Sequence, residues 1–257
     1  MPKRTIAGGR TLSLISLASA AALWEAAGRG GLVNPVLLST PTRILAEAWS
    51  MAASPGLWRD FVSTFSVFGA ALALALVVGT ALGLGMAVSH SMERILNPFV
   101  VALNAAPKIA LMPLVVLWCG IGWPSKLCLG TLMGAFPIIV GVYAGVKSLE
   151  RDYVLLARAY GAPPGLILRK VLLPGVVPAI LSSLRVALNY ALVGVLIVEF
   201  FAADSGVGHR MVVASADFRV DSFFALLMLL MGCALVLSEA VGALEKLIVT
   251  WRPETLG

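Results

Sequence analysis

The feature that most constrains this chain is a series of apolar stretches, each long enough to form a helix across a lipid bilayer. A bilayer core needs about 20 mostly apolar residues per helix, and the backbone polar groups of such a stretch are satisfied within the membrane by helix formation. We therefore predict an all-α, polytopic membrane protein, with one domain over residues 1–257. Its six spans are predicted at about 11–28, 61–88, 98–120, 124–146, 175–200 and 222–249.

The composition agrees with a membrane protein and excludes several other classes. Hydrophobic residues make up 60% of the chain and charged residues 12%, whereas soluble domains have about 25% charged residues. The net charge of +6 could suggest nucleic acid, but the basic residues are scattered between apolar stretches and form no patch with aromatics. Cys119, Cys128 and Cys233 lie in apolar stretches with no CxxC pair, which predicts small buried side chains and no metal site.

The distribution of basic residues predicts the orientation in the membrane. Six spans put both termini on one side, and an excess of Lys and Arg marks the cytoplasmic side. Two of the nineteen basic residues, Lys108 and Arg185, fall well inside spans, away from their ends. Of the rest, eleven share the side of the termini and six lie opposite, so both termini are predicted to be cytoplasmic. The eleven are Lys3, Arg4, Arg10, Arg94, Lys147, Arg151, Arg158, Arg169, Lys170, Lys246 and Arg252, and the six are Arg29, Arg43, Arg59, Lys126, Arg210 and Arg219.

Several local patterns predict the shape of individual segments. We expect the first stretch to be kept as a helix and not removed as a signal peptide, because Trp24 and Glu25 stand where a cleavage site needs small neutral residues. The glycines of the run 79–83 predict close helix packing. Pro107 and Pro113 remove backbone donors, which predicts a kink in the third span. The outer segment 204–221 suits a short re-entrant or surface helix.

The longest predicted cytoplasmic connection, residues 147–174, is amphipathic. We expect one short helix over 152–160, stopped by Gly161 with a positive φ, and a second over 166–172 that ends at Pro174. Pro163 and Pro164 prevent the first helix from continuing. Two interpretations are open: a helix pair that lies on anionic lipid headgroups, or a helical surface that binds a soluble partner.

Three motifs in this sequence carry a resemblance to a known family. ABC importer permeases have a docking loop with the pattern Glu-Ala-Ala, three residues, Gly, nine residues, Ile-x-Leu-Pro. Here the corresponding residues are Leu155-Leu156-Ala157, Gly161 and Val171-Leu172-Leu173-Pro174 at the same spacing, with the leading Glu-Ala replaced. Two further motifs resemble the nitrate, sulfonate and taurine class of these permeases. One is the run 106–114 with 118–122, and the other is 184–187 with 198–201 and 206–208. The resemblance extends from about Leu12 to Trp251.

The resemblance implies a permease subunit with type I ABC importer architecture in a bacterial inner membrane. Two copies, expected to be a homodimer, enclose one pathway, each copy docks one ATPase subunit, and an extracytoplasmic solute-binding protein delivers the solute. No G-x-x-x-x-G-K-[ST] motif occurs, so the chain is expected not to be an enzyme and to bind no cofactor, with ATP bound by the partner subunit. The residues that match the docking motif are Leu155, Ala157, Arg158, Ala159, Gly161, Ala162 and Pro164.

Charged residues within the spans are candidates for the substrate pathway. Lys108 and Arg185 are predicted about 15 Å deep, near the midplane, where a charge is costly and marks a pathway or a partner. Asn104 and Asn189 share the helical faces of these cations, and Glu199 lies near the face of Arg185, close to the outer surface. The alternative is that Lys108 extends to the interface, Arg185 binds backbone carbonyls, and Glu199 is hydrated at the membrane edge.

The two cations favour an anion, and the resemblance implies import of a small solute such as a sulfonate, taurine or nitrate. Two other ionisable residues give weaker indications of function. Glu239 is expected to form a hydrogen bond to a neighbouring helix, and His209 lacks a second metal ligand. An ion-gradient-driven secondary carrier is the alternative function, although six spans are few and no internal repeat is visible. A membrane-embedded protease is disfavoured because neither H-E-x-x-H nor G-x-S-x-G occurs.

Overall fold

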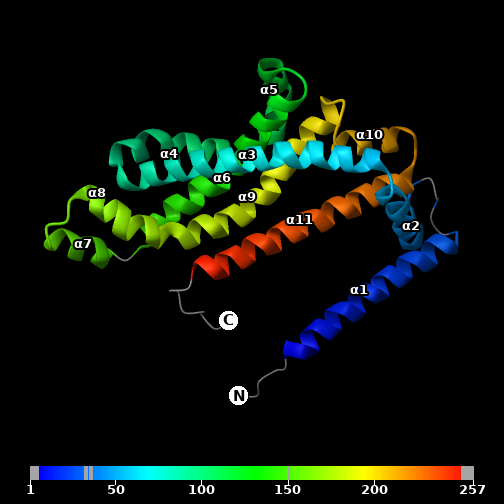
Figure 1. The fold of residues 1–257 in the computed structure, drawn as a ribbon, viewed down its shortest axis with the longest axis horizontal. Coiled ribbons are helices and arrows are strands. Elements are labelled where there is room, and N and C mark those ends of the chain that lie inside the picture. Colours follow the sequence, from blue (N-terminus) through cyan, green and yellow to red (C-terminus); the bar gives the residue numbers. More distant parts are fainter. Residues whose placement is uncertain (1–5, 32–33, 35–36, 150, 250–257) are drawn as a thin grey trace. The chain divides into compact units, whose positions relative to one another are not determined.

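All regular elements of the described chain are helices, which confirms the predicted all-α class (Figure 1). The structure is a computed structural model that describes residues 6–31, 34, 37–149 and 151–249, and the side chains of 6–11, 13–14 and 151–152 lie outside this description. Lys3, Arg4 and Arg252, which contribute to the predicted orientation, also lie outside it. The elements are α1 (Ile6–Arg29), α2 (Pro41–Ala52), α3 (Pro55–Val88), α4 (His90–Ala105), η1 (Lys108–Leu111), α5 (Met112–Cys119), α6 (Trp123–Lys147), α7 (Arg151–Ala159), α8 (Pro164–Ile167), η2 (Leu168–Leu172), α9 (Leu173–Phe201), α10 (Val207–Ala216) and α11 (Val220–Ile248).

The chain divides into two compact units. Unit 1 comprises Met1–Asp60 and Arg210–Met231, and unit 2 comprises Phe61–His209 and Gly232–Gly257. The boundaries fall within α3, α10 and α11. The organisation as one domain over 1–257 stays a prediction.

Unit 1 contains a cluster of ion pairs and aromatic contacts around α1 and α2. The Glu25 carboxylate accepts hydrogen bonds from the Thr42 amide at 3.0 Å, the Thr42 hydroxyl at 2.7 Å and Arg29 Nε at 2.6 Å. Thr40, the N-cap residue of α2, makes no side-chain cap, so Glu25 satisfies an amide in the first turn of α2. Trp24 packs edge-on against Phe224, with ring centroids 6.2 Å apart.

Long apolar helices account for most of the predicted spans. Within the described residues, four helices are long and apolar enough to cross a membrane: Pro55–Val88, Trp123–Lys147, Pro164–Phe201 and Val220–Ile248. The pair His90–Ala105 and Lys108–Cys119 counts as a fifth if it is one broken span. These match the predicted spans from the second to the sixth. The predicted first span, 11–28, lies within α1, and its crossing of the membrane stays a prediction.

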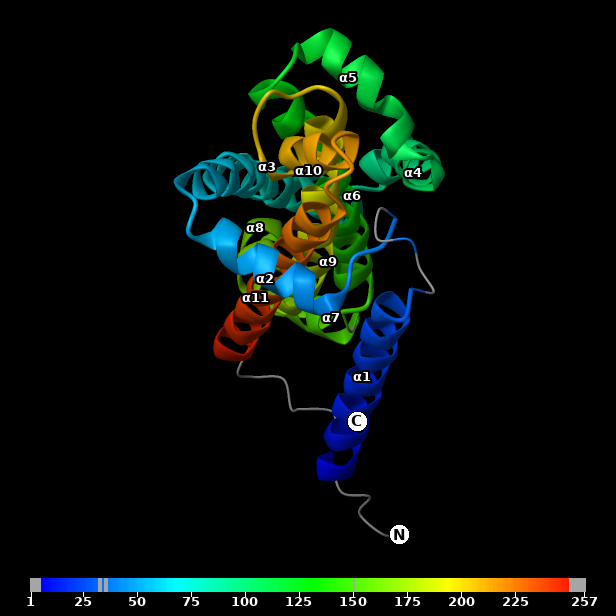
Figure 2. The same cartoon turned by 90° about the vertical axis from the view of Figure 1, so that its right-hand side faces the viewer.

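The core of unit 2 is built on α6, which packs along α9 (Figures 1 and 2) and against α3. A Cβ on Gly79 would lie 2.8 Å from Ile138, and a Cβ on Gly83 would lie 2.8 Å from the carbonyl oxygen of Ile139. The close packing predicted for the run 79–83 is therefore confirmed, and its neighbour is α6. The fully buried side chains of Ile138 and Val142 fill this contact.

The chain turns by 97° between α4 and the helices that follow it. Ala106 has φ −68° and ψ 143°, the extended backbone that a residue before proline prefers. Pro107 has no N–H to continue the ladder of α4. The predicted kink in the third span is confirmed, and Figure 1 shows α5 turned away from α4.

The connection over 147–174, predicted to be cytoplasmic, is one short helix followed by a long continuous helical run. Gly161 ends α7 with φ +74°, as predicted. The prediction that a second short helix ends at Pro174 is wrong, because α8, η2 and α9 continue from Pro164 to Phe201. The π-helical segment η2 explains this, since the Leu173 amide bonds to the Leu168 carbonyl. A wider turn avoids the clash that Pro174 would make in a regular helix.

The packing of α3 against α6 can be tested by filling the space at Gly83. We expect Gly83→Val to lower the free energy of unfolding by about 1–3 kcal/mol, because the new side chain meets backbone of α6, which cannot move aside easily. Gly69→Val is the matched control, since a Cβ there meets nothing within 4 Å. Thermal unfolding of the purified chain in detergent would measure both. Equal losses for the two variants would contradict the close contact.

Candidate functional site

The residues predicted to dock an ATPase lie at the surface of unit 2. We name Leu155, Ala157, Arg158, Ala159, Gly161, Ala162 and Pro164 the docking surface; five of them are exposed, and Ala157 and Ala162 are half-buried. Leu155 is 59% exposed, and its neighbour Tyr160, which sequence reasoning did not include, is 84% exposed. Apolar side chains presented together in this way are typical of an interaction surface.

Glu199, predicted to lie near the pathway, is instead enclosed by donors from three helices, α3, α6 and α10. Its carboxylate is fully buried and lies 3.0 Å from Lys126 Nζ and 2.9 Å from both the Thr64 hydroxyl and the Gly208 amide. Lys126 Nζ also bonds the Ser205 carbonyl at 2.8 Å. We call this set the Glu199 cluster. Burial of a charge requires a counter-charge and hydrogen bonds of this kind.

The Glu199 cluster holds the N-terminus of α10. The Val207 amide donates to the Thr64 hydroxyl at 2.9 Å, and together with the Gly208 amide it satisfies two of the free N–H groups of the first turn. Gly206, at φ +115°, has no room for a Cβ because the Glu199 carboxylate occupies that space. The sequence motif formed by Glu199 with 206–208 is thus one packed structure.

The alternative in which Glu199 is hydrated is wrong, since its side chain is 0% exposed. Lys126, predicted to lie on the outer side, is in the first turn of α6 with a side chain only 3% exposed. Its pairing with Glu199 was not predicted, because the two residues are 73 apart in sequence. The expected short helix in 204–221 is confirmed as α10.

A cavity of about 710 Å³ lies in unit 2, between the α4–η1 break, α6 and α9. Lys108 and Asn104, both predicted pathway residues, line it, whereas Arg185, Asn189 and Glu199 do not. Among the described residues of the lining, Lys108 is the only lysine, arginine or carboxylate. The other lining residues are Ala106, Pro107, Ile109, Met133, Pro137, Val140, Gly141, Ser182, Ser183, Val186 and Tyr190.

The break at Pro107 positions Lys108 in this cavity. Lys108 Nζ donates to the Asn104 carbonyl oxygen at 3.1 Å and lies 4.9 Å from the centre of the Phe136 ring. A carbonyl and a ring face stabilise an ammonium without neutralising it. Among the described residues Lys108 contacts no carboxylate, so the cavity carries a net positive charge.

Arg185 differs from Lys108 because it has an acidic partner. Its Nη2 lies 3.1 Å from Glu245 Oε2, near the end of α11, and a Cβ on Gly242 would lie 2.5 Å from the same nitrogen. Asn189 is exposed on α9. Glu239 is also exposed, and the hydrogen bond expected for it is not found among the described residues. The structure therefore separates the two cations that were predicted to act together.

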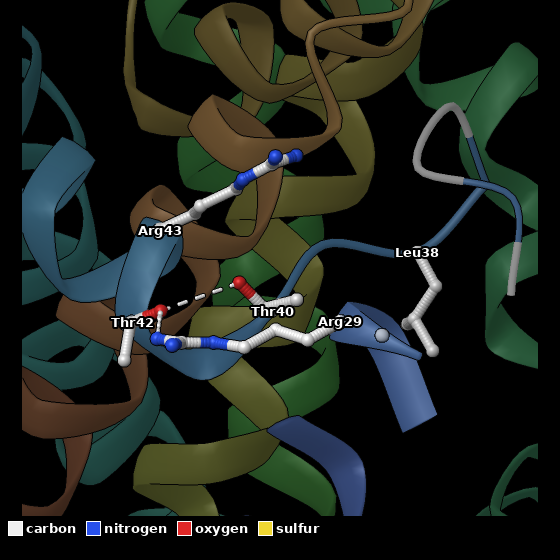
Figure 3. Close-up of a pocket in the computed structure, with 6 residues that line it drawn as sticks. Arg29, Leu38, Thr40, Thr42 and Arg43 are labelled. Carbon is white, nitrogen blue, oxygen red and sulfur yellow. Dashed lines mark hydrogen bonds between the residues drawn. The ribbon is translucent and has the colours of Figure 1, made fainter. Parts of the chain in front are cut away.

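Unit 1 contains a smaller pocket of about 250 Å³ lined by Arg29, Thr40, Thr42 and Arg43, with Gly28 and Leu38. Figure 3 shows the Arg29 side chain directed at Thr42, while Arg43 extends away from it. Arg29 is already paired with Glu25 at 2.6 Å. This pairing neutralises Arg29, so the pocket has a weaker positive charge than its two arginines suggest.

The ion pair of the Glu199 cluster can be tested by a double-mutant cycle. We expect Glu199→Gln to destabilise the chain by about 3–5 kcal/mol, because it leaves the Lys126 ammonium buried without a counter-charge. Adding Lys126→Met should recover part of this loss, since the unpaired charge is then removed. Thermal unfolding in detergent would measure all three variants against the unchanged protein. Strictly additive losses would contradict a direct ion pair.

Comparison with known proteins supports the features found in the sequence. Residues 79–249 match the family described as "Binding-protein-dependent transport system inner membrane component". The taurine transport system permease protein TauC of Escherichia coli K12 is 29% identical over 249 residues, which cover 95% of this chain and 90% of TauC. The formylaminopyrimidine transport permease protein ThiX of Halalkalibacterium halodurans is 30% identical, with 90% and 91% covered. The putative aliphatic sulfonates transport permease protein SsuC of Escherichia coli K12 is 29% identical, with 90% and 88% covered.

Solved structures share the fold. An inward-facing methionine ABC transporter, MetNI, aligns with a TM-score of 0.69 and 20% identity, covering 77% of this chain and 99% of the MetNI chain. An amino acid ABC transporter aligns with a TM-score of 0.56 and 16% identity, covering 77% and 95%. The architecture is therefore that of type I ABC importer permeases, and the comparisons give no support to a secondary carrier. The chain belongs to the family of inner-membrane permease components of binding-protein-dependent ABC importers.

Proposed function

We infer that this permease forms the translocation pathway for a small anionic solute, of the sulfonate, taurine or nitrate type. The observation that carries this proposal is the cavity of unit 2, which is lined by Lys108 and by no carboxylate. A cation without a counter-charge in a mostly apolar cavity attracts an anion. The taurine and sulfonate permeases among its relatives support the same class of solute.

The number of cations in the proposed pathway is smaller than the sequence suggested. Glu245 neutralises Arg185, so the proposal needs Lys108 alone among the basic residues. One uncompensated charge in each chain, and two in a dimer of identical chains, would suit a solute of low charge. The backbone carbonyl of Asn104 accepts a hydrogen bond from the Lys108 ammonium, so Asn104 would position Lys108 in the pathway.

The partners follow the general scheme of the family. A second copy of the chain would complete the pathway, an ATPase subunit would bind ATP and contact the docking surface, and an extracytoplasmic solute-binding protein would deliver the solute. Membrane lipid would surround the apolar helices. Both termini would be cytoplasmic in a bacterial inner membrane, with Arg158, Arg169 and Lys170 of the cytoplasmic connection on the same side.

A continuous helical run offers a mechanical link between these parts. The run from Pro164 to Phe201 begins in the docking surface, contributes Ser182 and Tyr190 to the cavity, and carries Glu199 near its end. A helix transmits displacement along its axis because its backbone hydrogen bonds resist stretching. Closure of the ATPase partners would therefore move the cavity wall together with the docking surface.

The docking surface can be tested at Gly161. We expect Gly161→Val to abolish co-purification of the ATPase subunit, because a β-branched residue is strained at φ +74° and the turn between α7 and α8 would change. Membrane insertion and yield of the permease should be unaffected, since a Cβ there meets nothing within 4 Å. Gly165→Val, in equally open surroundings but without positive φ, is the control and should retain most of the ATPase. Normal recovery of the ATPase with Gly161→Val would argue against this docking role.

The anion pathway can be tested by ATP-dependent uptake of taurine and ethanesulfonate into vesicles that contain the complete transporter. We expect Lys108→Met to reduce uptake at least tenfold, because a hydrogen bond to a charged group contributes about 1.5–3 kcal/mol. Arg185→Met should act mainly on stability, since it breaks the pair with Glu245. Unchanged uptake rates and half-saturating concentrations in Lys108→Met would remove the proposed pathway role.

A further inference from the structure

The wall of the cavity on α9 includes a tyrosine. Tyr190 lines the cavity, its side chain is 46% exposed, and its hydroxyl has no hydrogen-bond partner among the residues that the structure describes. Ser182, Val186 and Tyr190 are spaced by four residues, which places them along one face of the helix. Lys108 belongs to a different wall, formed by the α4–η1 break.

The two serines of this wall cannot serve as donors in the same way. The hydroxyls of Ser182, at 3.1 Å, and Ser183 both donate to the Ala179 carbonyl oxygen. Because a hydroxyl has one hydrogen, their remaining capacity is to accept. Tyr190 is therefore the neutral side-chain hydroxyl of the cavity that is free to donate.

We propose that Tyr190 is a specificity-determining residue, which donates a hydrogen bond to the same anionic oxygen group that Lys108 binds. The expected ligand is a monoanion with an acceptor-only head, such as a sulfonate, and a short apolar body. The head would lie between the ammonium and the phenol, and the body would contact Met133, Val140 and Val186. This inference rests on the proposed function, since it assigns a ligand to the proposed pathway.

The contributions of the Lys108 charge and the Tyr190 hydroxyl to binding can be separated by comparing a charged ligand with a neutral one. Lys108 stabilises an anion mainly by its charge, whereas Tyr190 adds a directed hydrogen bond that strengthens when the acceptor is charged. Ethanesulfonate and its neutral analogue ethanesulfonamide have similar shapes. A variant that only disturbs the shape of the cavity would weaken both probes equally. Loss of an anion-binding hydroxyl would weaken ethanesulfonate more.

The experiment measures binding of these two probes to the full chain, in complex with its ATPase, in lipid nanodiscs by saturation-transfer NMR. We expect Tyr190→Phe, which removes only the hydroxyl, to weaken ethanesulfonate binding about tenfold and ethanesulfonamide binding about twofold or less. Lys108→Met should weaken ethanesulfonate further, and the double variant should abolish its preference over the sulfonamide. Ser238→Ala, a hydroxyl deletion on α11 outside the cavity, is the control.

Three results would overturn the proposal: ethanesulfonate affinity unchanged in Tyr190→Phe, equal weakening of both probes, or no measurable binding to the unchanged protein at tens of millimolar. None of these depends on ATP-driven import. Failure of the proposed function would instead appear as absent ATP-dependent uptake by the unchanged transporter, with the binding measurements intact. The two conclusions can therefore fail separately.

Discussion

The cost of an unpaired charge within a membrane protein governs much of this structure. Lys126 is paired with Glu199, Arg185 with Glu245, and Lys147 with Glu93, at N···O distances between 2.9 and 3.1 Å. Each pair joins helices that are distant in the sequence, so satisfying the charges also fixes the packing. Lys108 differs from these residues, because within the described part of the chain its ammonium contacts a carbonyl oxygen and an aromatic ring but no carboxylate. An exception of this kind is a stronger indication of function than a charge alone.

The helical run from Pro164 to Phe201 connects three features that would otherwise be separate. It starts at the docking surface, lines the cavity and ends beside the Glu199 cluster. The π-helical segment at 168–172 allows this continuity despite Pro174, since it adjusts the turn in which the proline ring would clash. π-Helical turns frequently occur at functional sites, and this one lies between the surface that would receive force and the cavity that would respond to it.

Local sequence patterns predicted the elements but not the partners between them. The length of apolar stretches located five spans that the structure supports, Pro107 predicted the bend, and Gly161 predicted the positive φ. The ion pairs could not be predicted, because Lys126 and Glu199 are 73 residues apart and Arg185 and Glu245 are 60 apart. Helical periodicity predicts which face of a helix a residue occupies, but it does not predict which other helix packs against that face. Arg185 and Lys108 therefore looked equivalent from the sequence, although only Lys108 lines the cavity.

The sparse chemistry of the cavity is consistent with transport. A pathway must bind its solute strongly enough to admit it and weakly enough to release it. The lining has few polar side chains, namely Lys108, Tyr190, Asn104 and two serines, among apolar ones such as Met133, Val140 and Val186. Arg185 is paired with Glu245 and does not line the cavity, so Lys108 is the single charged side chain in its described lining. A lone ammonium in a mostly apolar wall is a charge that an anion could approach and then leave.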